Sequence, residues 1–407
     1  MRGRIIGAAA TAAMLLSAFA ISPVAAGIPA ATLLVVDDDG MASTTDCGAS
    51  DMAFSTIQAA VTAATPGGTV KVCPGTYTES VTVDKTLKLV GPHAGQSAKD
   101  CAARTDDATV TSSDLAGTFR LGAADILLSG FEVSGNGSGP GIYTSPNFSG
   151  YKVRHNIIAD NTFGVYYHAS GELASQLGKN CISDNNRSGS ASGDGVYSDQ
   201  GLRNAGIFDN GFEENDSAAV VLIGEGAGIS SIRATKNSSF NDASFLVSIS
   251  VRELRITANV VRDDRSGEPG SAVYIGFASR DVLIQDNYVR SGHSRGIYLD
   301  GESDAIVVQD NLIKRTGEGI LNNSTAEGAA LIRSNTVRNV DGDGIHMTAV
   351  TSRNFLTANR ATGSGLVDCR DETTGSERQG VANKWVGSGP GRNIGQVSSP
   401  TNLCRPD

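Results

Sequence analysis

The segment RSNTVRNVDGDGIHM, residues 333–347, contains two features that recur along most of the chain. The first is an asparagine, which returns most often after 24 residues and stands at positions 156, 180, 204, 237, 259, 287, 311, 335, 359 and 383. The second is a small residue followed by an aliphatic one, at Gly141-Ile142, Gly164-Val165, Gly195-Val196, Ala272-Val273, Gly296-Ile297, Gly319-Ile320 and Gly344-Ile345. Repeats of this length, with short strand-like pieces and no helical pattern, predict a parallel β-solenoid in which each repeat forms one coil.

The recurring asparagine has a structural explanation. We expect it at a sharp corner between strands, because asparagine tolerates left-handed backbone angles better than most residues. Asparagines stacked on successive coils can then form a ladder of hydrogen bonds. We therefore interpret these residues as structural and not as catalytic.

The repeats resemble those of a known group of proteins. The pieces DNLIKRTGEGI (310–320) and SNTVRNVDGDGI (334–345) are similar to the repeats of right-handed parallel β-helix proteins of the pectin-lyase-like superfamily, and residues 383–404 resemble the closing coil of secreted actinobacterial members. That group includes polysaccharide lyases, pectin methylesterases and mannuronan epimerases. The resemblance implies an all-β, single-stranded right-handed parallel β-helix that spans residues 27–407. Because the fold carries many activities, the resemblance specifies function weakly.

One helix is expected near the start of this domain. The segment FSTIQAAVTAA, residues 54–64, has an apolar stripe and a capping box formed by Ser55 and Gln58. We predict that this helix covers the first coil, since an open solenoid end exposes strand edges and apolar core.

Residues 1–26 read as a secretory signal peptide, with a basic start, an apolar run and a small-residue cleavage site. Secretion to the extracellular space is therefore expected, with no membrane contact after cleavage, and we predict a monomer. Removal of Arg2 and Arg4 with this segment changes the net charge from −10 to −12. Such a charge disfavours nucleic acid as a partner, and it disfavours a polyanionic glycan unless Ca²⁺ bridges acid to acid.

Six cysteines follow the predicted cleavage site. An even number in an exported chain indicates disulfides. We predict the pairs Cys369–Cys404, in the closing coil at 369–404, and Cys47–Cys73. Metal binding is the alternative, although no CxxC or HxxH spacing supports it.

Strand alternation predicts which side chains face outward after each aliphatic residue. The first outward column contains Tyr143, Tyr166, Tyr197, Val221, Leu246, Tyr274, Tyr298, Leu321 and His346. The second contains Ser145, His168, Asp199, Ile223, Ser248, Gly276, Asp300, Asn323 and Thr348. The tyrosines of the first column offer a platform for sugar stacking, although tyrosine also favours strands without any function.

The first candidate site joins the two columns on adjacent coils. Tyr166 is expected beside Tyr197, and His168 beside Asp199. A carboxylate next to an imidazole raises its basicity, and a phenol can donate a proton to a leaving group. Mannuronan epimerases and several lyases of this fold similarly carry His, Asp and Tyr on the active strand, although the epimerase Asp-Pro-His-Glu motif is absent here.

The second candidate cluster lies towards the carboxyl end. It contains His293, Arg295, Tyr298, Asp300, Glu318, Asp343 and His346. Arg295 could pair with a sugar carboxylate, and Glu318 with Asp343 could act as the two carboxylates of a hydrolase. The motifs of polygalacturonases are otherwise missing, so this interpretation is the weaker one.

Two functions remain open from the sequence. One is a lyase or C5-epimerase acting on a uronate-containing extracellular polysaccharide, with no cofactor other than a possible Ca²⁺. The other is a non-catalytic solenoid that binds a glycan or the cell wall.

Overall fold

The computed structural model describes residues 32–263 and 268–407. The predicted signal peptide, at residues 1–26, lies outside the described residues. Within the described part, no helix is long and apolar enough to cross a membrane.

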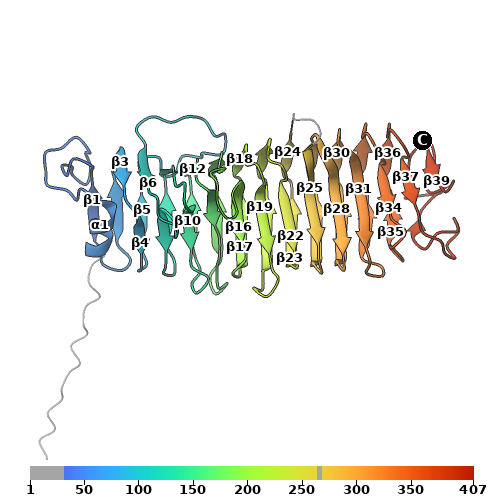
Figure 1. Ribbon diagram of the computed structural model, residues 1–407, viewed down its shortest axis with the longest axis horizontal. Helices are drawn as coiled ribbons and strands as arrows, with labels where there is room; N and C mark the ends of the chain where they lie inside the picture. Colours follow the sequence, from blue (N-terminus) through green and yellow to red (C-terminus); the bar gives the residue numbers. More distant parts are fainter. Residues whose placement is uncertain (1–31, 264–267) are drawn as a thin grey trace, which may run out of the picture. The chain divides into compact units, whose positions relative to one another are not determined.

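The described residues from 32 onward form a parallel β-solenoid, as the repeats predict (Figure 1). Each full coil contributes one strand to each of three sheets, and every neighbouring pair of strands within a sheet runs parallel. The three sheets therefore form the walls of a stack of coils around one continuous apolar core.

The 14-stranded sheet contains, in spatial order, β1 (Leu33–Val36), β2 (Thr69–Val72), β5 (Lys88–Val90), β8 (Leu127–Ser129), β11 (Lys152–Arg154), β14 (Ser175–Gly178), β17 (Arg203–Phe208), β20 (Ser230–Thr235), β23 (Arg252–Thr257), β26 (Arg280–Gln285), β29 (Asp304–Gln309), β32 (Ala330–Arg333), β35 (Phe355–Thr357) and β38 (Lys384–Trp385). The 12-stranded sheet contains β3 (Gly75–Thr78), β6 (Ala108–Thr111), β9 (Glu132–Ser134), β12 (Ile157–Ala159), β15 (Cys181–Ser183), β18 (Gly211–Glu213), β21 (Ser238–Phe240), β24 (Val260–Arg262), β27 (Tyr288–Arg290), β30 (Leu312–Lys314), β33 (Thr336–Arg338) and β36 (Arg360–Thr362).

The 13-stranded sheet carries the aliphatic residues of the recurring Gly-Ile pairs. It contains β4 (Val81–Val83), β7 (Phe119–Leu121), β10 (Pro140–Thr144), β13 (Phe163–Tyr166), β16 (Asp194–Ser198), β19 (Ala218–Ile223), β22 (Leu246–Ile249), β25 (Glu268–Gly276), β28 (His293–Gly301), β31 (Glu318–Ser324), β34 (Ile345–Met347), β37 (Cys369–Asp371) and β39 (Ser398–Ser399). Its inward residues, such as Val165, Ile297 and Ile320, are fully buried. Alternation therefore turns the next residue of each strand outward.

An asparagine ladder runs along the corner between the 14-stranded and 12-stranded sheets, as predicted. It consists of Asn156, Asn180, Asn210, Asn237, Asn259, Asn287, Asn311, Asn335, Asn359 and Asn393. Two members were predicted wrongly, since Asn210 replaces Asn204 and Asn393 replaces Asn383. Loop insertions explain both errors, because a fixed period of 24 residues skips to the wrong asparagine where a coil is longer.

The backbone role predicted for these asparagines was also wrong. The residue before each of the first nine ladder asparagines, not the asparagine itself, has a positive φ, for example 55° at Asp286 and 57° at Asp310. The asparagines are buried and point inward, where their side chains satisfy the backbone of the neighbouring coil.

A second ladder, which the sequence pattern did not reveal, follows the corner between the 12-stranded and 13-stranded sheets. It consists of Asn136, Asn161, Asn185, Asn215 and Asp242. In the coils of the first candidate site, this ladder stabilises the turns that connect the 12-stranded sheet to the 13-stranded sheet.

The helix predicted at residues 54–64 is present as α1 (Ile57–Ala63), and its buried side chains are Ile57, Ala60 and Val61. The predicted capping box is wrong. Thr56 is the N-cap, and the carboxylate of Glu79 accepts the N–H groups of Ile57 and Gln58 at 2.7 and 2.9 Å. That helix α1 covers the first coil stays a prediction.

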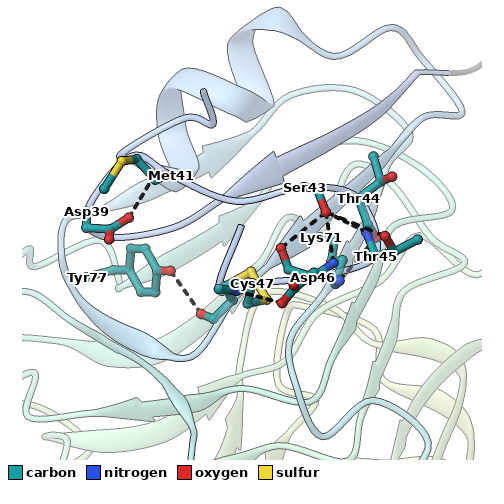
Figure 2. The surroundings of a disulfide bond; sticks show 11 residues. Asp39, Met41, Ser43, Thr44, Thr45, Asp46, Cys47, Lys71 and Tyr77 are labelled. Carbon is teal, nitrogen blue, oxygen red and sulfur yellow. Dashed lines mark hydrogen bonds between the residues drawn. A yellow bond between two sulfur atoms is a disulfide. The ribbon is translucent and has the colours of Figure 1, made fainter. Parts of the chain in front are cut away.

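Three disulfides fasten loops to the solenoid. The predicted pairs Cys47–Cys73 and Cys369–Cys404 are confirmed, and Cys101–Cys181 joins the loop before β6 to strand β15. Figure 2 shows the surroundings of Cys47, where the phenol of Tyr77 donates a hydrogen bond of 2.9 Å to the carbonyl oxygen of Cys73.

Candidate functional site

The tyrosines of the first outward column stand in register on consecutive strands of the 13-stranded sheet. Arg120 of β7 pairs with Tyr143 of β10, Tyr143 with Tyr166 of β13, and Tyr166 with Tyr197 of β16. The ring centroids of Tyr143 and Tyr166 lie 5.7 Å apart, as do those of Tyr166 and Tyr197. The predicted column is thus confirmed here. Sequence reasoning missed Arg120, which an extension of the register by one coil would have found.

The column departs from the prediction at one coil. Leu246 was expected to face outward, but it pairs with Val220 and is fully buried, while Val247 occupies the outward position beside Val221 and Tyr274. The same shift replaces Ser248 with Ile249 in the second column. This coil lacks the small residue before its strand, so the start of the strand was misjudged by one residue.

Asp199 lies directly after β16 and accepts hydrogen bonds from both neighbouring tyrosines. The phenol of Tyr166 donates to Oδ1 at 2.7 Å, and the phenol of Tyr197 donates to Oδ2 at 3.3 Å. The amide of Gln200 donates to the Tyr166 oxygen at 2.7 Å. The structure therefore brings together Tyr166, Tyr197 and Asp199, as the sequence predicted.

Both phenols are held in the neutral state by their surroundings. Burial and the adjacent Asp199 raise the pKa of Tyr166 above its ordinary value, and they raise the pKa of Tyr197 to about 12. Neither phenol is suited to remove a proton at neutral pH, whereas each can donate a hydrogen bond.

His168 does not face outward, so its predicted orientation was wrong. Strand β13 ends at Tyr166, and the backbone then turns so that the side chain of His168 is fully buried. The backbone N–H of His168 donates to the hydroxyl of Thr144 at 2.7 Å, and the ring Nδ1 lies 3.1 Å from the Thr144 carbonyl oxygen. Alternation fails here because it holds only while the strand continues.

The predicted rise in basicity of His168 was wrong too. Its Nε2 lies 3.7 Å from Oδ1 of Asp199, but burial outweighs this carboxylate and lowers the pKa of His168 to about 4. The neutral ring packs against Tyr166, with 4.2 Å between ring centroids. His168 therefore contacts the site from the buried side, through the ring of Tyr166.

The three tyrosines and Asp199 form one side of a cleft of about 820 Å³. Its remaining lining comes from Arg120 and Phe163 on the sheet and from three turns at residues 115–116, 138–140 and 188–191. Among the described residues of the segment 206–269, none lines this cleft. The cleft combines aromatic rings, a carboxylate and an arginine, a composition that suits a hydroxyl-rich ligand.

In the second candidate cluster, Tyr298 and Asp300 face outward as predicted. Asp300 accepts hydrogen bonds from the phenol of Tyr274 at 3.0 Å and from the amide of Asn323 at 2.8 Å. Burial disfavours the charge of Asp300, but these bonds and that of the Gly301 backbone outweigh it and lower the pKa. The guanidinium carbon of Arg295 lies 4.7 Å from the centroid of the Tyr298 ring.

His293, predicted as part of this cluster, is buried, and its Nε2 lies 3.1 Å from the carbonyl oxygen of Asp242. Glu318 and Asp343 belong to a network of charged groups around His346. Its Nδ1 lies 3.2 Å from Glu318 and 3.6 Å from Asp343, and its Nε2 lies 3.1 Å from Glu372. Arg370 completes the network, with its Nε 3.0 Å from Oδ2 of Asp343. Glu318 and Asp343 are thus engaged with cations, which does not resemble the free acid and base of a hydrolase.

This network predicts a pH effect on stability. Burial opposes protonation of His346, but the hydrogen bond to Glu318 and the charges of Glu318, Glu372 and Asp343 raise its pKa above 6.5. The stabilising contribution is therefore fully present below pH 6.5 and is lost as the pH rises through the raised value. We expect the substitution His346→Gln to destabilise the protein more at pH 6 than at pH 9, as measured by urea unfolding. Equal destabilisation at both pH values would contradict this account.

Taken together, the fold and the cleft define a parallel β-solenoid with aromatic and acidic side chains on the outer face of one sheet. Residues 222–378 match the model of a family described as NosD, periplasmic copper-binding protein. This match covers less than half of the chain; it includes the network around His346 but none of the residues that line the cleft. No curated protein matches the chain.

Proposed function

We propose that this protein is an exported solenoid that binds a linear, neutral glycan of the cell wall or extracellular matrix in the cleft beside Tyr166 and Tyr197. The observation that carries the proposal is the hydrogen-bonded set of two tyrosines and Asp199 in the wall of that cleft. Its export is supported by the signal-like residues 1–26 and by the similarity to a periplasmic family.

The chemistry of the cleft favours sugars over other ligands. Tyrosine rings offer apolar faces for the C–H side of a pyranose, and a carboxylate accepts hydrogen bonds from its hydroxyl groups. The negative Asp199 and the net charge of −10 disfavour a polyuronate. A neutral glycan can stack on the tyrosine rings and bond to Asp199, and these negative charges do not repel it.

The substitution Tyr197→Ala is expected to weaken glycan binding at least tenfold, because it removes one stacking ring and one hydrogen-bond donor to Asp199. The measurement is calorimetric titration with cello-, manno- and laminari-oligosaccharides, with alginate and polygalacturonate as the anionic arm. Tyr288→Ala is the matched control, because Tyr288 is a half-buried strand tyrosine of the 12-stranded sheet.

The outcomes of this titration separate the alternatives. Binding of a neutral glycan that Tyr197→Ala weakens and Tyr288→Ala leaves intact supports the proposal. Wild-type protein that binds none of these glycans contradicts it.

A second candidate function is uronate elimination or C5 epimerisation in the same cleft. One observation favours it: the phenol of Tyr166 is 2.7 Å from Asp199, which pairs a proton donor with a carboxylate base, and Arg120 lines the cleft as a partner for a sugar carboxylate. His168 would act indirectly, since it is buried behind Tyr166. The test is ultraviolet absorbance of the unsaturated product from alginate or polygalacturonate. If this product forms with the wild type and not with Asp199→Asn, the protein is an enzyme and the proposal of simple glycan binding is wrong.

The family description raises the question of copper, and the described residues fit that metal poorly. Ligand atoms of Glu318, Asp343 and His346 lie within 4.8 Å of one another. However, Arg370 pairs with Asp343, and the set offers a single imidazole and no sulfur, while all six cysteines form disulfides. We therefore assign no copper chemistry to this cluster. The Ca²⁺ that the sequence left possible is a separate prediction, which the structure does not test.

A further inference from the structure

The arrangement of the cleft occurs a second time on the same sheet. In the cleft, Tyr166 and Tyr197 stand on consecutive coils, and Asp199 follows Tyr197 by two residues. Farther along, Tyr274 and Tyr298 also stand on consecutive coils, and Asp300 follows Tyr298 by two residues.

The two sets also share their internal contacts. The phenol of the first tyrosine donates to the aspartate in both, over 2.7 Å from Tyr166 to Asp199 and 3.0 Å from Tyr274 to Asp300. The paired rings have similar separations, 5.7 Å in the first set and 5.3 Å in the second. Burial raises the pKa of Tyr274, as it does that of Tyr166. The two sets therefore share a pair of tyrosine rings and an aspartate bonded to the first phenol, although the ring planes meet at 31° in the first set and at 60° in the second.

The separation of the two sets follows from the strand order. Strands β13, β16, β19, β22 and β25 are consecutive neighbours in the 13-stranded sheet, so four strand steps separate Tyr166 from Tyr274. At the usual spacing of paired strands this distance is about 19 Å along the solenoid. Four steps also separate the strand of Tyr197 from that of Tyr298.

The surface between the two sets carries no charge in the two outward columns. The intervening coils place Val221 and Val247 in the first column, and Ile223 and Ile249 in the second. Such a strip neither repels a neutral chain nor holds it by hydrogen bonds. It would allow one extended ligand to pass from the first set to the second.

We infer that Tyr274, Tyr298 and Asp300 form a second glycan subsite, and that one linear polymer runs along the 13-stranded sheet and occupies both sites. This inference rests on the proposed function of the cleft. The second site differs by the stacking of Arg295 on Tyr298, which adds guanidinium donors beside that ring. Binding at the second site is then intramolecular, so a chain that spans about 19 Å gains affinity over a shorter one.

The test is a titration with graded cello-, manno- and laminari-oligosaccharides and their parent polymers, by calorimetry. For the wild type, we expect affinity to rise at least tenfold once the oligosaccharide spans both sites. Tyr274→Ala should abolish this rise, so that long and short oligosaccharides bind with similar affinity, whereas Tyr197→Ala should weaken every length. Tyr288→Ala again serves as the matched control, and circular dichroism confirms that each variant is folded.

The possible failures are distinguishable. If the wild type binds oligosaccharides but Tyr274→Ala behaves like the wild type at every length, the second subsite is wrong and the cleft proposal stands. If the wild type binds no oligosaccharide or polymer, the proposed function fails and the second subsite fails with it.

Discussion

Replacing Asn287 with alanine is expected to lower the free energy of unfolding by about 3–5 kcal/mol. Asn287 lies in the middle of the longer ladder and is 3% exposed. Its Oδ1 accepts hydrogen bonds from the backbone N–H and the amide of Asn259, at 3.0 and 2.9 Å, and its Nδ2 donates to Ile256 and Asn311 at 2.9 Å each. Alanine leaves these buried groups without partners, and each such group costs about 1–3 kcal/mol.

The measurement for this prediction is urea unfolding followed by circular dichroism. Asn147→Ala is the control, because Asn147 is an exposed turn residue whose side chain takes no part in either ladder. We expect that variant to stay within about 0.5 kcal/mol of the wild type. A comparable loss in both variants would show that the ladder contributes no more than an ordinary surface asparagine.

Acidification is expected to destabilise the protein through His168, by about 3 kcal/mol between pH 6.5 and pH 4. Burial lowers the pKa of His168 to about 4 in the folded chain, against 6.5 when the chain is unfolded. Because the folded value is the lower one, the stabilising contribution is present above pH 6.5 and is lost as the pH falls through about 4. The groups that face the ring are Asp199, Tyr166 and Tyr143.

The variant His168→Gln isolates this effect, because glutamine does not titrate. The difference in unfolding free energy between wild type and variant should shrink as the pH falls from 7 to 4. Asp194 titrates in the same window with a pKa raised to about 7 by burial, but it is present in both proteins and cancels from the difference. A difference that stays constant over this range would contradict a buried, neutral His168.

The alternation of strand residues into two outward columns predicted the candidate site in part. Tyr166, Tyr197 and Asp199 came together because strand pairing brings residues of equal register to adjacent coils. His168 was misplaced because its position depends on hydrogen bonds to Thr144, a residue 24 positions earlier in the chain. The turns that wall the cleft gave no sequence signal, since loops follow no repeating pattern.

The sequence by itself determined the solenoid, two of the three disulfides and most of the longer asparagine ladder. The solenoid and the ladder follow from the period of the repeat and the alternation of strand residues, and the disulfides follow from the even number of cysteines in an exported chain. The tertiary structure alone decided which residue of each corner turns left-handed, where loop insertions move the ladder from Asn204 to Asn210, and that His168 is buried. Each of these depends on contacts between coils, whose free energy outweighs local preference and which no single repeat contains.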